Sequence, residues 1–207
     1  VGPLRFPEGY RPVSFPWERL DGRPLIYASL GTLQNRIAGL FRVIAEACDG
    51  LDAQLVISTG HGVTPEELGN LPGCPIVVAY APQLELLRRS TLAITHAGLN
   101  TVLDAMTTGT PLVAIPVTNE QPGIAARVAW IGAGEIIVHQ HVTSQALRTA
   151  IIRVRSNPSY RAAAERVRDA IQAAGGAPRA AELIEQRLGL GTCNDVEENG
   201  MSCTALS

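Results

Sequence analysis

Small polar residues and a glycine gather at one point of the sequence, between an apolar run and a helical pattern. They are His96, Gly98, Asn100 and Thr101, with Ala97 and Leu99 between them, and they follow the apolar run 92–95. The N-terminus of a helix carries unpaired N–H groups and a partial positive charge, so this joint is a candidate anion site. Gly98 lets the backbone approach an anion closely, and His96 and Thr101 can add donors. A plain helix cap made by Asn100 or Thr101 is the alternative.

A second joint of the same kind lies at the end of the apolar run 25–30. It contains Ser29, Gly31 and Thr32, just before another helical pattern. Their hydroxyls and backbone amides could serve the same anion as the first joint. An ordinary turn is the alternative.

A third joint contains an aromatic residue at the end of the run 76–80. The Tyr80 ring can stack on a nucleotide base, and the backbone of Ala81 can pair with the edge of that base. Gln83, after the turn that Pro82 stiffens, can reach a ribose. The alternative is that Tyr80 simply packs at a strand end.

Two further polar groups extend this pattern toward a sugar. In the expected helix 99–107 an apolar stripe begins at Leu99, and Asp104 lies on another side, one turn beyond the anion site, where it could accept hydrogen bonds from a ribose. Glu120 and Gln121 follow the run 111–116 and suit adjacent sugar hydroxyls. The alternatives are a solvated Asp104 and a helix start capped by Asn119.

The elements that must position these residues alternate along the chain. Apolar runs predict six strands, at 25–30, 53–58, 76–80, 92–95, 111–116 and 135–139. Helical spacing predicts helices at 36–48, 82–89, 99–107, 121–132, 143–155, 159–174 and 178–188. Continuous apolar strands separated by helices are typical of an α/β protein with a doubly wound, Rossmann-like parallel sheet. Such sheets bind ligands beyond the carboxyl ends of their strands, where all the joints above would lie.

Length and composition set the limits of the protein. The 207 residues suit one sizeable domain, and the formal charge of −2 argues against a nucleic-acid partner. Four cysteines without a metal-like spacing suit a reducing, cytoplasmic compartment. No apolar run reaches the roughly 18–20 residues that span a bilayer, and no signal peptide opens the chain. We expect an interdomain linker at 1–23, the ligand-binding domain at 24–188, a flexible tail at 189–207, and a longer parent protein.

The stretches YAPQLELL and THAGLNTVLDAMTTGTPLVAIPVTNEQ resemble the signature of family 1 glycosyltransferases of the GT-B fold, which use UDP-sugars. The resemblance extends to about residue 188. Within that family, the sequence resembles the bacterial zeaxanthin glucosyltransferases in further detail. It implies the C-terminal, nucleotide-sugar-binding domain of such an enzyme. Three positions depart from the usual pattern: Tyr80 replaces a tryptophan, Ala97 a glycine or cysteine, and Glu120 an aspartate.

The resemblance implies a role for each candidate residue. Tyr80 and Ala81 would bind the base, Gln83 and Asp104 the ribose, and Glu120 and Gln121 the sugar. The diphosphate cradle would comprise Ser29, Gly31, Thr32, His96, Gly98, Leu99, Asn100 and Thr101. The family's catalytic histidine belongs to an N-terminal domain that this chain lacks, and His61 is only a candidate contact of the nucleotide-sugar.

The implied function is an inverting transfer of glucose from UDP-glucose to a hydroxyl of a small apolar acceptor, such as a carotenoid. The UDP-sugar is a co-substrate, and neither a cofactor nor a metal is expected. Without the N-terminal domain the chain alone would be inactive. Peripheral contact with the inner face of a membrane is compatible with an apolar acceptor. Three alternatives stay open: a non-catalytic subunit of a split transferase, a macrolide- or sterol-type transferase, and, ranked last, a sugar-nucleotide epimerase.

Overall fold

The computed structural model describes residues 1–4, 13–31 and 38–189, and the chain forms two compact units. One unit comprises residues 11–170 and contains the sheet; the other combines residues 1–10 with 171–207. The described part of the second unit includes helix α8 (Gly176–Leu188), which begins and ends next to glycines with left-handed backbone. No helix in the described ranges is long and apolar enough to cross a membrane. The predicted site residue Thr32 and the predicted tail from 190 onward lie outside the described residues.

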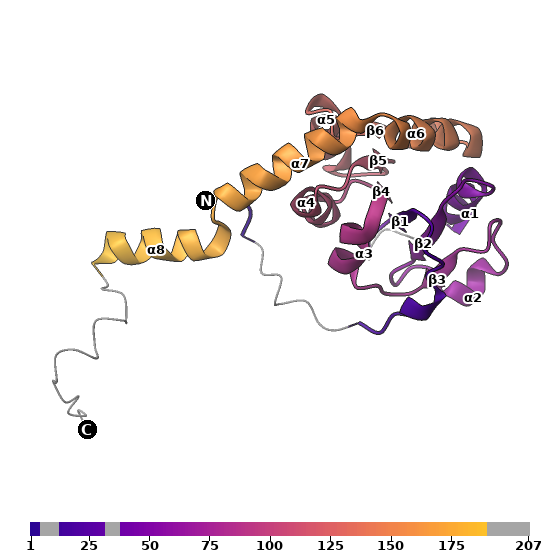
Figure 1. Ribbon diagram of the computed structural model, residues 1–207, viewed down its shortest axis with the longest axis horizontal. Helices are drawn as coiled ribbons and strands as arrows, with labels where there is room; N and C mark the ends of the chain where they lie inside the picture. The colour runs from indigo at the N-terminus through magenta and orange to yellow at the C-terminus, as the bar shows by residue number, and fades with distance from the viewer. Residues whose placement is uncertain (5–12, 32–37, 190–207) are drawn as a thin grey trace, which may run out of the picture. The chain divides into compact units, whose positions relative to one another are not determined.

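A single sheet of six parallel strands forms the centre of the larger unit, in the order β3-β2-β1-β4-β5-β6 (Figure 1). The strands are β1 (Leu25–Ser29), β2 (Gln54–Ser58), β3 (Ile76–Val78), β4 (Ser90–Thr95), β5 (Leu112–Ala114) and β6 (Gly134–Ile136). Strand order reverses between β1 and β4, which are hydrogen-bonded neighbours. This confirms the predicted doubly wound α/β fold and places the ends of β1 and β4 side by side.

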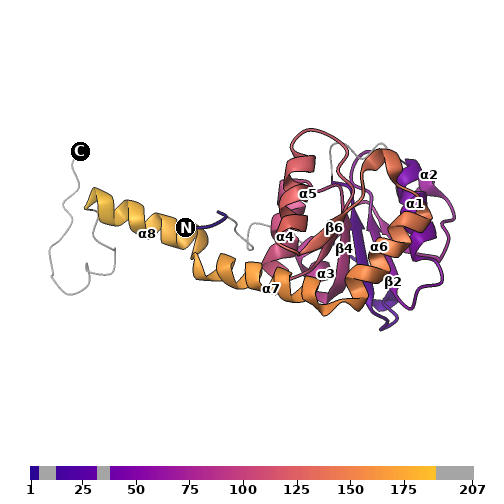
Figure 2. The same ribbon diagram turned by 90° about the horizontal axis from the view of Figure 1, so that it is seen from above.

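Helices cover both faces of this sheet (Figure 2). On one face α1 (Ala38–Cys48) packs against α6 (Ser144–Ser156). On the other lie α3 (Gln83–Arg89), α4 (Leu99–Thr108) and α5 (Gln121–Trp130). Ile26 and Ala28 of β1 join the buried core shared with α1 and α6. Because side chains alternate along a strand, Tyr27 points to the opposite face, toward α3.

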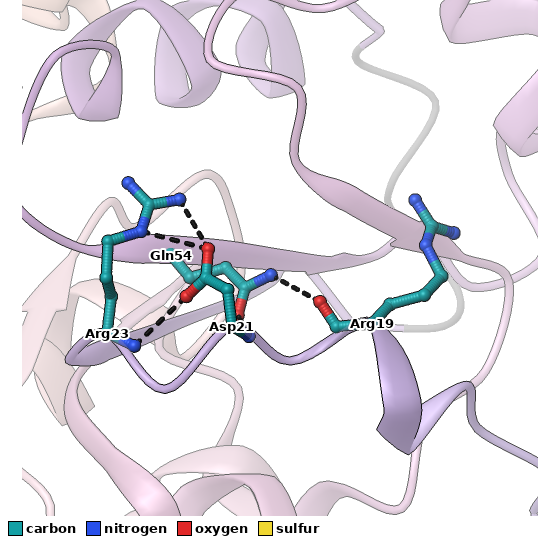
Figure 3. A network of polar contacts seen from close by, with 4 residues as sticks. All are labelled: Arg19, Asp21, Arg23 and Gln54. Atoms are coloured by element: carbon teal, nitrogen blue, oxygen red, sulfur yellow. Dashed lines mark hydrogen bonds and ion pairs between the residues drawn. The ribbon is translucent and has the colours of Figure 1, made fainter.

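The segment before β1, predicted as a linker, is held to the sheet where it is described. Its 3-10 turn η2 (Trp17–Arg19) precedes two hydrogen bonds with Gln54 of β2 (Figure 3). The Gln54 amide donates to the Arg19 carbonyl at 2.8 Å, and its oxygen accepts from the Asp21 backbone at 3.0 Å. Arg23 pairs with the Asp21 carboxylate at 2.7 Å. The chain therefore enters β1 along a fixed path.

Element boundaries differ from the sequence-based expectation at several strand ends. The third strand ends at Val78, so Ala79 and Tyr80 lie in a bend beyond it. The sixth strand ends at Ile136 and is followed by the 3-10 turn η3 (His139–His141). Helix α2 (Pro65–Leu68) was not predicted, although Thr64 and Glu67 form a capping box at its start. Helices α6 and α7 (Pro158–Ala173) lie close to the predicted ranges 143–155 and 159–174.

Candidate functional site

The joint between β4 and α4 is a tight turn of three residues, His96, Ala97 and Gly98. Gly98 is the N-cap of α4, and its carbonyl accepts the first helical hydrogen bond, from Val102. The capping alternative is therefore wrong, since neither Asn100 nor Thr101 stands at the cap position. Ala97 is buried and takes a left-handed backbone with φ of 64°. The N-terminus of α4 therefore stands at the carboxyl end of the sheet.

The His96 imidazole lies against two glycines that are far apart in the sequence. A Cβ built on Gly98 would stand 2.5 Å from its Nε2, and one built on Gly31 would stand 2.6 Å from its Cε1. Only residues without a side chain can occupy these two positions while the ring stays in place. The ring thus joins the turn after β1 to the N-terminus of α4, as the prediction of one shared cradle requires.

Electrostatics keep this imidazole neutral at pH 7. Burial lowers the pKa of His96, and the nearby Glu120 carboxylate only partly opposes that effect. Its Nδ1 lies 3.4 Å from the Thr95 hydroxyl, which also accepts a hydrogen bond from the Ala97 backbone at 3.3 Å. A neutral imidazole offers one N–H donor, which suits an anion without carrying a permanent charge.

The turn after β1 supplies the other side of this cradle. Ser29 is buried, and its hydroxyl accepts from the Gly31 backbone at 3.4 Å. Gly31 has φ of 81°, a left-handed conformation that favours glycine. Together with the contact to His96, this gives Gly31 two separate reasons to be glycine.

The candidate ribose residues Gln83 and Asp104 form a chain of hydrogen bonds with Tyr27, which was not predicted as a site residue. Gln83, at the start of α3, donates from Nε2 to the Asp104 carboxylate at 2.7 Å. Its Oε1 accepts from the Tyr27 hydroxyl at 3.3 Å. Asp104 is 2% exposed, so the alternative of a solvated helix residue is wrong. A tyrosine inside an otherwise apolar strand was the available signal, because a buried hydroxyl needs a partner.

The expected apolar stripe of α4 needs correction. Leu99, where it was expected to begin, is 51% exposed, whereas Asp104, expected on another side of the helix, is buried, as is Thr101. The helix instead buries a face that includes Val102 and Met106. Leu99 therefore lies at the exposed tip of the helix, where the candidate anion site is.

The candidate base-binding joint follows β3. Tyr80 is 38% exposed, so it is not packed away at the strand end. Its ring contacts the His61 ring edge-to-face, with centroids 4.9 Å apart. Ala81 follows the bend and Gln83 opens α3. Tyr80 is thus accessible from outside the protein, and His61 lies beside it.

The candidate sugar residues stand at the start of α5. Gln121 is buried, and its Oε1 accepts from the backbones of Val117 at 2.8 Å and Thr118 at 3.0 Å. This leaves the Gln121 amide group as a donor, while the exposed carboxylate of Glu120 offers acceptors. Asn119 has φ of 54° and does not stand at the cap position, so the alternative of an Asn119 cap is wrong.

Four joints thus lie at the edge of the sheet where the parallel strands end. The described residues include no group of three or more His, Cys, Asp or Glu side chains arranged to hold a metal ion. The fold and this edge define an α/β domain of the GT-B glycosyltransferase type, in which ligands bind at the carboxyl ends of the strands. A profile of the family "UDP-glucoronosyl and UDP-glucosyl transferase" matches residues 21–169. The chain belongs to this family.

Individual relatives agree with the family and show how much of each protein is matched. The chain is 37% identical to a zeaxanthin glucosyltransferase of Pantoea ananas over 188 residues, which cover 90% of this chain and 43% of that protein. The solved structure of the glycotransferase of kitacinnamycin gives a TM-score of 0.77 at 31% identity, covering 86% of this chain and 47% of that one. The glycosyltransferase VinC in complex with DTDP gives 0.70 at 25% identity, covering 82% and 43%. The chain spans about half the length of these proteins.

Proposed function

We propose that this chain is the donor-binding part of an inverting, metal-independent glucosyltransferase. The enzyme would transfer glucose from UDP-glucose to a hydroxyl of a small apolar acceptor such as a carotenoid. The observation that carries the proposal is the position of His96 against Gly31 and Gly98. It brings an imidazole, a turn with a buried serine and the N-terminus of α4 to one point, which suits a diphosphate. The similarity to a zeaxanthin glucosyltransferase supports the acceptor class.

The remaining joints assign the rest of the donor molecule. We place the uracil on the exposed ring of Tyr80, and the ribose at Gln83 with Asp104 behind it. Glu120 accepts from sugar hydroxyls, and the Gln121 amide donates to them. The diphosphate is bound by His96 and the first turn of α4, with Ser29 and Gly31 opposite, and Thr32 stays a predicted contact.

In this proposal the reaction needs a base from the part of the protein beyond this chain. That base deprotonates the acceptor hydroxyl, whose oxygen attacks the anomeric carbon from the face opposite UDP. The bond between that carbon and the diphosphate oxygen breaks, and the electron pair leaves with UDP. Amides of the first turn of α4 and the neutral His96 stabilise the developing charge, as donors already aimed at it.

Calorimetric titration of the 207-residue chain with UDP, UDP-glucose, TDP and ADP tests the nucleotide assignment. We expect UDP and UDP-glucose to bind, TDP to bind more weakly and ADP not to bind. Equal affinity for ADP would contradict the base assignment at Tyr80. Joined to the remainder of its parent protein, the chain should transfer glucose to zeaxanthin, and failure there with an intact donor site would contradict the acceptor assignment.

A single substitution separates sugar binding from nucleotide binding. Glu120→Ala should weaken UDP-glucose binding by about 1.5–3 kcal/mol, the loss expected for a hydrogen bond to a charged group. Its affinity for UDP should not fall, because UDP has no sugar there and the loss of a negative charge near His96 does not disfavour a diphosphate. Glu46→Ala, which removes an exposed carboxylate on α1, is the matched control and should change neither affinity. Equal loss for both ligands would place Glu120 elsewhere in the site.

A further inference from the structure

Tyr27 stands in the middle of the central strand β1 and is 1% exposed. Burial raises the pKa of its hydroxyl to about 12, so the group keeps its proton throughout the physiological range. Its hydroxyl donates to Gln83 Oε1 at 3.3 Å, across the gap between the sheet and the start of α3. No sequence motif of the site includes this residue, and it cannot itself touch a ligand at the surface.

The Gln83 side chain is therefore held at both ends. Its oxygen accepts from Tyr27, and its nitrogen donates to Asp104 Oδ2 at 2.7 Å. Asp104 is 2% exposed, and a carboxylate oxygen accepts hydrogen bonds. If the Gln83 amide rotated by half a turn, its Oε1 would face Asp104 Oδ2, and two acceptors would meet. Gln83 is half-buried and is the outermost of the three side chains.

A side-chain amide has two N–H donors and two acceptor lone pairs. The two buried partners of Gln83 use one donor and one lone pair. One N–H and one lone pair are left, with their directions set by the bonds beneath. This is the pattern that two neighbouring hydroxyl groups need, because each hydroxyl can both donate and accept.

We propose that Tyr27 is a positioning residue for ribose recognition, which holds the Gln83 amide so that its free N–H and lone pair meet the two ribose hydroxyls. The inference rests on the proposed function, because it takes the ligand to be a uridine diphosphate. It adds that the choice of ribose over deoxyribose depends on a hydroxyl buried inside the sheet. Without that hydroxyl, Gln83 Oε1 loses its buried donor and the amide is no longer fixed.

The test compares UDP with 2′-deoxy-UDP, using calorimetry on the full 207-residue chain. The wild type should prefer UDP by about tenfold or more, the effect of one lost hydrogen bond in a site built to hold it. Tyr27→Phe should reduce that preference to about threefold or less, while the affinity for 2′-deoxy-UDP changes little. Tyr160→Phe is the matched control: it also removes a hydroxyl that donates to a side chain, Glu135 at 2.7 Å, and it should keep the full preference.

A double mutant separates positioning from a general structural effect. In a Gln83→Ala background, Tyr27→Phe should leave the UDP preference unchanged, because the side chain it positions is gone. A further loss in that background would overturn the inference. An unchanged preference in Tyr27→Phe alone would also overturn it, with the proposed function intact. If the wild type binds neither nucleotide, the proposed donor site is wrong, and the inference is wrong with it.

A measurement on the wild type keeps the inference testable if Tyr27→Phe does not fold. The Nε2 group of Gln83, assigned by ¹⁵N-edited NMR, should show restricted side-chain motion in ¹⁵N relaxation, and its proton bonded to Asp104 should exchange slowly with solvent. Relaxation typical of a freely moving side chain, with both protons exchanging rapidly with solvent, would show a mobile amide and would overturn the inference.

Discussion

Replacing Gly98 with alanine should disturb the candidate diphosphate site through one contact. The added Cβ would lie 2.5 Å from His96 Nε2, whereas ordinary contacts begin at 3.4 Å. The ring must therefore retreat by about 0.9 Å, the difference between these two distances. Gly98 has φ of −61°, so alanine brings no backbone strain. We expect a loss of stability of about 1–3 kcal/mol from overpacking, with up to about 1 kcal/mol more because alanine is a poor N-cap.

A double-mutant cycle with His96→Ala isolates the ring contact. Removing the imidazole removes the clash, so Gly98→Ala should then cost only the N-cap term, and a coupling of about 1–2 kcal/mol should appear. Urea unfolding of the four proteins measures it. Gly123→Ala, in α5 with open space around the new Cβ, is the matched control and should be neutral or stabilising. Additive effects within about 0.5 kcal/mol would refute the contact between His96 and Gly98.

Three further substitutions or titrations test other parts of the structure. Arg161→Lys should lower the free energy of unfolding by about 1.5–3 kcal/mol, since Arg161 donates to three backbone carbonyls and lysine cannot reproduce its planar fork; chemical denaturation measures this, and full stability would contradict it. Iodoacetamide at pH 8 should label exposed Cys74 but not Cys48, whose pKa burial raises to about 12; peptide mapping before and after unfolding decides. Because burial lowers the pKa of His96, its contribution to stability should be fully present above the unfolded-state pKa of about 6.5 and should be lost as pH falls from there through the lower folded-state pKa. An anion beside the ring should raise the folded-state pKa. UDP-glucose, which has no titrating phosphate in this range, should therefore take up protons on binding near pH 6; calorimetry in two buffers measures the uptake, and His96→Ala should abolish it.

The sheet could be predicted because strands buried on both faces are continuous apolar runs. β1 and β2 are examples: nearly every residue in them is buried. Strand ends were less certain, because the apolar run at β3 continues through Ala79 and Tyr80 after the strand has ended. Apolar character reports burial, whereas a strand ends where its ladder of hydrogen bonds to the neighbouring strand ends.

The sequence predicts which polar joints follow the carboxyl ends of the strands, but not the contacts among their side chains. Periodicity places polar residues on the open side of a helix, and this was wrong for Asp104, which is buried with Gln83 as its partner. Tyr27 was missed for the converse reason: it stands in an apolar strand, and its partner belongs to a different element. Contacts between residues distant in the sequence carry no local signal, so only the fold reveals that these three side chains form one chain of hydrogen bonds.

The two glycines beside His96 look alike in the sequence, yet they should respond differently to rescue. Gly31 has a left-handed φ of 81° as well as the ring contact, whereas Gly98 has the contact alone. Removing the ring should therefore relieve the Gly98→Ala defect apart from its capping term. It should leave a residual cost of about 1–2 kcal/mol for Gly31→Ala, because alanine disfavours that backbone with or without the imidazole. Urea unfolding of Gly31→Ala with and without His96→Ala measures this residual cost. Complete rescue by His96→Ala would contradict the reasoning, because it would mean that the turn after β1 can relax to a backbone conformation that any amino acid adopts.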